Sequence, residues 1–205
     1  MAISDLLWAC PECGQDRGLE PDKPGFRCRA CGTHYRRGQG ASIVARRPSG
    51  SEVVRQPAEW LDRISAPQTL VRQGDIGDEV IRSARVRAAR VTGTDTVHGE
   101  TGYLNRIEIW GEESSGTLQV RSDRLVFVAD AARTPEEWPL ETVTAVQASS
   151  STLQINRRGA ALVSFRFLDD SIFLWEELLH AVLRGFYRRT GRGEIVEFQP
   201  RVVTE

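Results

Sequence analysis

The chain holds four cysteines, and they fall into two Cys-x-x-Cys pairs near its start. Cys10 and Cys13 form the first pair, Cys28 and Cys31 form the second, and a glycine follows each pair. A tight turn within such a pair brings both sulfurs to one metal ion, and the glycine relieves backbone strain where the turn ends. Two pairs separated by fourteen residues therefore offer four soft ligands to one tetrahedral ion.

Zinc suits four thiolates in a tetrahedral shell, so the two pairs predict a zinc ribbon over residues 1–40. Iron remains an alternative, because it also binds four thiolates. Two structural disulfides would require an oxidising compartment, to which nothing in the sequence points. A redox-active pair would begin a helix within a βαβ unit, and no such pattern surrounds either pair.

The metal of this ribbon is expected to be structural, because four thiolates leave no position for water or a substrate. His34 follows Cys31 by three residues, but beside a complete shell it is expected on the surface of the ribbon's last strand. Trp8, Phe26 and Tyr35 are expected to pack around the site. So small a unit buries little apolar surface, and the metal would therefore supply most of its folding energy.

The whole chain has 205 residues, 40% of them hydrophobic, and a net charge of −1. This length accommodates one mid-sized domain beside the ribbon. The near-neutral charge excludes a global attraction to nucleic acid or membrane, so a local patch would have to hold such a partner. Lys23 is the only lysine among many arginines, which is typical of a GC-rich bacterial genome.

No transmembrane segment is expected, since no stretch approaches the roughly twenty apolar residues of a membrane span. Residues 6–10 end at a cysteine, but they lack the basic and apolar regions of a lipoprotein signal. The sequence therefore predicts a cytoplasmic protein, with peripheral association at the inner membrane face as an option.

Residues 41–77 are predicted to form a linker with a short helix. Glycine, serine and proline over 38–57 are typical of a flexible connection. A helix is predicted from Pro57 to about residue 66, with proline in its first turn and with Trp60, Leu61 and Ile64 on one face. Trp60 is expected to anchor this helix on the domain that follows.

From residue 78 the pattern changes to strands rich in β-branched and aromatic residues, with turn residues between them. One amphipathic helix is predicted over 171–189, with an N-cap at Asp169 or Asp170 and Trp175 on its apolar face. A short final strand is expected at 194–199, within a C-terminal tail over 191–205. The seven predicted strands are 79–92, 103–111, 116–121, 124–129, 143–149, 152–157 and 161–168.

This region resembles a known family. Residues 116–120 (GTLQV) and 123–127 (DRLVF) are similar to the G-x-L-x-V-T-x-x-R-L-x-F stretch of GRAM domains, which belong to the pleckstrin-homology superfold. Residues 138–146, Phe165 and the helix that carries Trp175 extend the resemblance over about 78–190. It implies a mainly β fold, in which a seven-stranded PH/GRAM-like barrel is capped by a C-terminal helix and follows the small zinc ribbon.

The resemblance also singles out arginines of the first strand as ligand-binding candidates, because basic residues near the first hairpin of pleckstrin-homology domains bind phosphoinositides. The candidates are Arg82, Arg85, Arg87 and Arg90. Arg85 and Arg87 are two residues apart, so in a strand they project from the same face and can grip a phosphate together. Neighbouring acids such as Glu79 and Glu108 leave a neutralised, solvated face as the alternative.

No catalytic constellation is visible, since the three histidines, the serines and the paired carboxylates match no known catalytic spacing. We therefore expect no enzyme but an adaptor whose PH/GRAM-like domain docks on anionic lipid or on a protein partner. One alternative is nucleic-acid binding through the arginines of the ribbon, although residues 1–40 carry six basic against five acidic residues. Another is an accessory subunit of a lipid-modifying enzyme.

Overall fold

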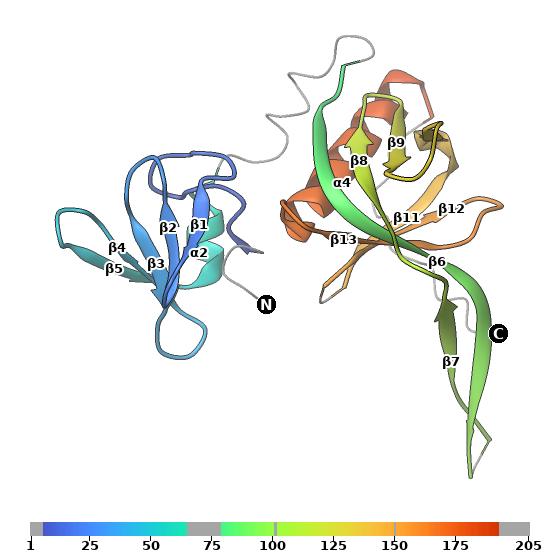
Figure 1. Cartoon of the computed structure of the whole chain (residues 1–205), viewed down its shortest axis with the longest axis horizontal. Helices are drawn as coiled ribbons and strands as arrows, with labels where there is room; N and C mark the ends of the chain where they lie inside the picture. Colours follow the sequence, from blue (N-terminus) through green and yellow to red (C-terminus); the bar gives the residue numbers. More distant parts are fainter. Residues whose placement is uncertain (1–5, 65–78, 101, 150, 193–205) are drawn as a thin grey trace.

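The computed structural model describes residues 6–64, 79–100, 102–149 and 151–192, which form two antiparallel β-sheets and a long C-terminal helix (Figure 1). The first sheet has five strands in chain order, and a short helix follows it. Its elements are β1 (Leu19–Asp22), β2 (Gly25–Cys28), β3 (His34–Arg37), β4 (Ile43–Arg46), β5 (Glu52–Arg55) and α2 (Pro57–Leu61).

The prediction of a linker over residues 38–57 is wrong, because this stretch contains β4 and β5 of the first sheet. β4 pairs with β3 and β5 pairs with β4, both antiparallel. The proline, serine and glycine residues after β4 form a hairpin turn that the Arg47 amide closes by donating to the Ser51 carbonyl at 2.9 Å. Turn residues have the same composition whether they join two paired strands or two domains, and the sequence pattern did not separate these cases.

The predicted short helix is present as α2, but Trp60 does not anchor it on the following domain. The Trp60 ring is fully buried, lies edge-on to Tyr35 at 5.8 Å, and its Nε1 donates to the Ile43 carbonyl at 3.1 Å. The tryptophan therefore fixes the helix on its own sheet, whose inner face carries Ile43 and Ala45 in the same cluster. Residues 65–77 of the expected linker lie outside the described residues.

The second sheet curls into a half-barrel, and each of the seven predicted runs is a strand in it. Its order is β10-β9-β8-β6-β13-β12-β11, with β7 paired to β6 outside this path. β10 is an additional short strand that the sequence pattern did not predict. The elements are β6 (Arg82–Gly99), β7 (Gly102–Trp110), β8 (Ser114–Val120), β9 (Arg124–Ala129), β10 (Glu136–Pro139), β11 (Val143–Ala148), β12 (Leu153–Arg157), β13 (Val163–Phe167) and α4 (Ile172–Arg189).

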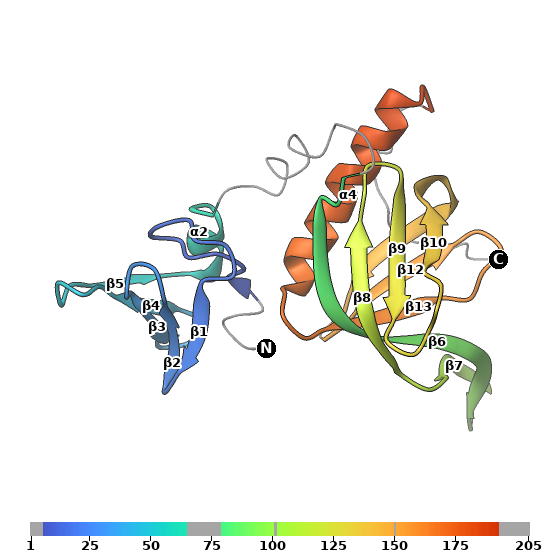
Figure 2. The ribbon, with the colours of Figure 1, turned by 45° about the horizontal axis from the view of Figure 1, so that its top comes forward.

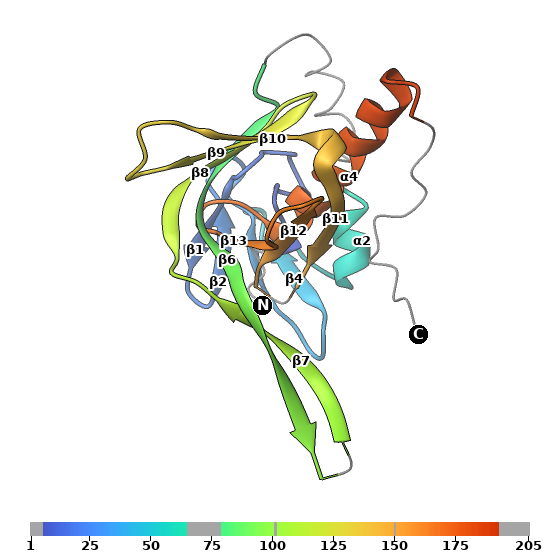
Figure 3. The same ribbon diagram turned by 90° about the vertical axis from the view of Figure 1, so that its right-hand side faces the viewer.

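The long strand β6 takes part in both the curled sheet and a separate hairpin. Its first half pairs with β8 on one side and with β13 on the other, at the centre of the curled sheet. Its second half pairs with β7 alone, and this hairpin projects away from the half-barrel (Figures 1 and 3). Gly116 of β8 lies where the next strand passes closely, since a Cβ there would be 2.4 Å from the Val128 carbonyl oxygen. Only glycine fits this position without a backbone shift.

The helix α4 covers the core of the curled sheet. Its residues Trp175, Leu178 and Leu179 are fully buried, as helical spacing predicted, and α4 packs against β11 and β12 (Figure 2). The N-cap is Ser171 rather than an aspartate, and its side chain accepts from the Leu174 amide at 3.4 Å. The predicted final strand at 194–199 lies outside the described residues. No helix in the described part of the chain is long and apolar enough to cross a membrane.

Candidate metal centre

The two cysteine pairs adopt the same backbone geometry. The Cys10 carbonyl accepts from the Gly14 amide at 2.7 Å, and the Cys28 carbonyl accepts from the Gly32 amide at 2.8 Å. The amides of these two cysteines donate to the carbonyl five residues further on, at 3.0 and 2.9 Å. Gly14 and Gly32 have φ values of 73° and 72°, a left-handed conformation that favours glycine. The glycine after each pair is therefore required by the turn.

The four sulfurs converge on one point. All of them lie within 4.8 Å of one another. The Sγ atoms of Cys10 and Cys31 are 3.6 Å apart, and those of Cys13 and Cys28 are 3.7 Å apart. Four sulfurs about 2.3 Å from one tetrahedral ion would lie about 3.8 Å from each other. The four cysteines are thus arranged to hold a single metal ion.

His34 takes no part in this cluster. It lies on β3 beside the fully buried Tyr35, and neighbouring residues of a strand point to opposite faces. The Tyr35 hydroxyl is 3.1 Å from the Cys10 sulfur, whereas His34 Nε2 is 3.1 Å from a carboxylate oxygen of Asp22. The histidine therefore lies on the outer face of the sheet. Trp8 and Phe26 pack against the cluster that holds Tyr35, as the sequence predicted.

Burial and hydrogen bonding shift the pKa values of the Cys10 and Cys31 thiols in opposite directions. Burial raises the pKa of the Cys10 thiol to about 12, although the Tyr35 hydroxyl opposes this shift. Burial also raises the pKa of Cys31, but hydrogen bonds with Thr33 outweigh it and lower that pKa to about 7. A metal binds thiolates, so metal binding must displace protons from the cluster.

The four candidate arginines of β6 do not form one anion-binding face. Arg85 and Arg87 share the outer face, as predicted, but Arg82 lies on the opposite face with its side chain only 5% exposed. The three exposed arginines each lie against a carboxylate: Arg85 pairs with Asp130, Arg87 with Glu113 and Arg90 with Glu136. The acids that neutralise this strand are therefore not the Glu79 and Glu108 that the sequence indicated.

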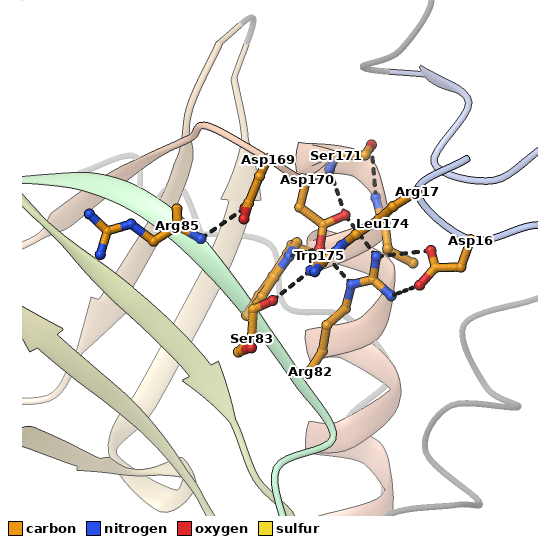
Figure 4. A network of polar contacts seen from close by, with 10 residues as sticks. All are labelled: Asp16, Arg17, Arg82, Ser83, Arg85, Asp169, Asp170, Ser171, Leu174 and Trp175. Carbon is orange, nitrogen blue, oxygen red and sulfur yellow. Dashed lines mark hydrogen bonds and ion pairs between the residues drawn. The ribbon is translucent and has the colours of Figure 1, made fainter. Parts of the chain in front are cut away.

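Arg82 instead joins the two parts of the chain (Figure 4). Its Nε and Nη2 donate to the Asp170 carboxylate at 2.6 and 2.8 Å. Its Nη1 and Nη2 donate to the Asp16 carboxylate at 2.9 and 3.1 Å. Asp16 follows the first cysteine pair, and Asp170 precedes α4. One guanidinium thus makes two bidentate pairs, one within the barrel and one with the ribbon.

The Asp170 carboxylate accepts further hydrogen bonds. Its side chain is 1% exposed and also accepts from Arg17 Nη2 at 2.6 Å and from Trp175 Nε1 at 2.9 Å. Arg17 comes from the ribbon and also donates to the Ser83 carbonyl at 2.5 Å. Its φ of 48° is unusual for a residue other than glycine. The partners of Arg82 are 66 and 88 residues away in sequence, so no local pattern indicated them.

Comparisons with known proteins do not assign this chain to a family. No family model and no curated protein matches this chain. Among solved structures, the crystal structure of the C-terminal domain of an unknown protein from Leishmania infantum matches with a TM-score of 0.35 and 13% identity. That match covers 52% of this chain and 86% of the other, and a similarity this low carries no argument about function.

We expect one zinc ion per chain, held by the four sulfurs. Cys28→Ser should abolish stoichiometric zinc binding and unfold the ribbon, because the metal supplies most of the folding energy of so small a unit. His34→Ala should retain the full zinc content. Elemental analysis of the purified chains, together with circular dichroism, measures both effects. Loss of zinc in the histidine variant would contradict the four-sulfur assignment.

We expect Asp16→Arg to separate the ribbon from the barrel, because a second cation would face Arg82 in place of its carboxylate partner. The radius of gyration, measured by small-angle scattering at low salt, should increase while both parts remain folded. Asp62→Arg makes the same charge change at another exposed position of the first unit and should leave the radius unchanged. Equal radii for the two variants would contradict the docking role of Asp16.

We expect Asp170→Asn to lower the free energy of unfolding of the barrel by roughly 3 kcal/mol, because it removes one partner of a buried pair. Burial alone would raise the pKa of Asp170, but Arg82 and then Arg17 outweigh it and hold that pKa below its usual value. The folded state therefore binds this proton less tightly than the unfolded chain does. The contribution is present above the unfolded pKa and is lost as the pH falls through the folded pKa.

Urea titrations at pH 7 and near pH 3 measure this effect. The difference in stability between Asp170→Asn and the unmodified chain should shrink at the lower pH. Asp130→Asn is the control, because its carboxylate pairs with Arg85 on an exposed face, where solvent screens the pair, and the substitution should change stability little. A constant difference across this pH range would contradict the ionic role of Asp170.

Proposed function

We propose that the chain is a non-catalytic adaptor in which a structural zinc site supports a small ribbon joined to a PH/GRAM-like barrel. The observation that carries the proposal is the closed set of four sulfurs at tetrahedral spacing. A catalytic zinc keeps a position open for water or substrate, whereas four thiolates fill the shell. Zinc is preferred to iron because it is the usual metal of such closed structural sites.

The strand order supports the resemblance to GRAM and pleckstrin-homology domains. Seven strands form one antiparallel path with β6 at its centre, and a C-terminal helix packs on the core they enclose. The close approach at Gly116 gives a physical reason for the first glycine of the motif. In this interpretation the β6–β7 hairpin is a long extension between the first and second strands of the barrel.

The shifted pKa values favour a binding role over catalysis. Active sites typically show strongly shifted titratable groups that line a cleft. In the described part of this chain, the shifts belong to the cysteine cluster with Tyr35, to arginine–carboxylate contacts, and to Arg157, whose pKa is lowered by burial where it lies over the Trp138 ring. These groups have structural partners, so the proposal assigns none of them to acid–base chemistry.

The charge pairing on β6 favours a protein partner over an anionic lipid surface. Arg85, Arg87 and Arg90 already lie against carboxylates, and a lipid headgroup would have to displace these partners. The projecting hairpin instead exposes Ile107 and Ile109, each 50% accessible and two residues apart on β7. Exposed aliphatic residues on one face of a hairpin are suited to contact with another protein.

Vesicle flotation of the zinc-loaded chain tests this choice. We expect no flotation with phosphatidylcholine vesicles and none that depends on added phosphatidylserine, at low or moderate salt. Asp130→Ala frees Arg85 and serves as the positive control, because an unpaired arginine on this face should increase binding to the anionic vesicles. Anionic-lipid binding by the unmodified chain that Arg85→Glu with Arg87→Glu removes would replace the protein partner with a membrane surface.

A further inference from the structure

The outer face of the five-stranded sheet holds a basic hollow that the adaptor role does not use. Its volume is about 680 Å³, and it reaches from the β1–β2 turn to the β4–β5 turn. Six of its lining residues are basic or histidine, and one is acidic. These residues are Lys23, Arg27, His34, Arg36, Arg46, Arg47 and Glu52. We call this site the basic hollow.

The register of the sheet aligns the central residues of the basic hollow. His34 of β3 lies directly opposite Arg27 of β2 on one side and opposite Arg46 of β4 on the other. Residues opposite each other in neighbouring strands point to the same face. Their chain neighbours Tyr35 and Ala45 are buried on the inner face, in the cluster around the cysteines. Arg27, His34 and Arg46 therefore face solvent, because successive side chains of a strand point alternately to the core and to the outer face.

The cations of the basic hollow differ in whether they have partners. Three of them already contact carboxylates: Arg36 with Glu52 at 3.3 Å, Arg47 with Glu12 at 2.8 Å and His34 with Asp22 at 3.1 Å. Lys23, Arg27 and Arg46 make no ion pair with any residue that the structure describes. The unpaired charge of this hollow thus contrasts with β6, whose exposed arginines all have carboxylate partners.

Arg27 and Arg46 are separated by one strand, so their backbones are about 10 Å apart. Arginine side chains of this spacing can reach one group between them, and each guanidinium presents a planar fork to an oxyanion. Gly32 borders the hollow and ends the second cysteine pair, with φ at 72°. The metal centre therefore fixes one wall of the hollow.

We propose that the basic hollow binds a phosphate group through Arg27 and Arg46, with Lys23 contributing charge at its edge. Two unpaired guanidiniums and an ammonium favour a multiply charged anion over a single carboxylate. Tyr35 is the only lining residue of the phenylalanine, tyrosine or tryptophan type and it is buried, so the hollow offers no large aromatic surface on which a nucleobase could stack. The chemistry recognised is thus the phosphate itself, on a free phosphorylated molecule or on a phosphodiester chain.

Calorimetric titration of the zinc-loaded chain with inorganic pyrophosphate tests the site, and a single-stranded oligothymidylate forms the second arm. We expect one pyrophosphate per chain, with an affinity that falls as salt is raised. Arg27→Gln with Arg46→Gln should weaken binding roughly tenfold or more, since two charge-assisted contacts are lost. Oligothymidylate binding that the same variant abolishes would identify a phosphodiester backbone as the source. Pyrophosphate binding alone would identify a small phosphorylated molecule.

The matched control also removes two positive charges, but from the barrel instead of the basic hollow. Arg133 and Arg158 are exposed there, so Arg133→Gln with Arg158→Gln should leave the titration unchanged. Zinc content and thermal unfolding of both variants establish that the ribbon is intact. Equal losses in the two double variants, or no binding of either probe by the unmodified chain, would overturn the proposal. The vesicle experiment is independent of these results, because it concerns the face of β6 and uses other variants.

Discussion

The convergence of four sulfurs on one point is the constraint on which the first half of this structure depends. A five-stranded sheet of four-residue strands has a small core, and a metal ion held by the four sulfurs would compensate for the apolar area that it lacks. The turns that hold the sulfurs also position residues of two other sites. Asp16 follows the first pair and reaches the barrel, while Gly32 ends the second pair and borders the basic hollow. The cysteine turns thus border two surfaces, the docking contact with the barrel and the basic hollow.

The contact between ribbon and barrel is ionic, and only its barrel side is buried: Arg82 and Asp170 are 5% and 1% exposed, whereas the Asp16 side chain of the ribbon is 51% exposed. Taking the Arg82 guanidinium and the Asp170 carboxylate out of water is costly, and the cost is offset only because both groups make several charge-assisted hydrogen bonds. Such an arrangement contributes more to specificity than to net stability, since a displaced partner leaves a buried charge. The network therefore favours one docked arrangement, in which Asp16 and Arg17 meet Arg82, Ser83 and Asp170 (Figure 4).

Charge is distributed differently on the two outer surfaces of the molecule. On the barrel, the exposed arginines of β6 lie against acids from other strands and loops, which leaves little net attraction for an anion. On the ribbon, strand register sets Arg27 and Arg46 on either side of His34. Glu20 and Glu52 lie opposite these arginines in the outer neighbouring strands, but neither arginine makes an ion pair within the described residues. The resemblance to pleckstrin-homology domains directed attention to β6 for anion binding, whereas two neighbouring arginines without an ion pair lie on the ribbon.

Local chemistry was readable from the sequence alone. Two Cys-x-x-Cys pairs predicted the metal cluster, runs of β-branched and aromatic residues bounded by turn residues predicted the strands of the barrel, and helical spacing around Trp175 predicted α4, because each signal acts within a few residues. What the sequence could not determine depended on distant partners. The stretch over 38–57 pairs with β3 instead of linking domains, Trp60 packs on its own sheet, and Arg82 turns inward to meet Asp16 and Asp170. Side-chain partners of this kind are selected by the packed fold, since burial and register decide which charges meet and which remain free.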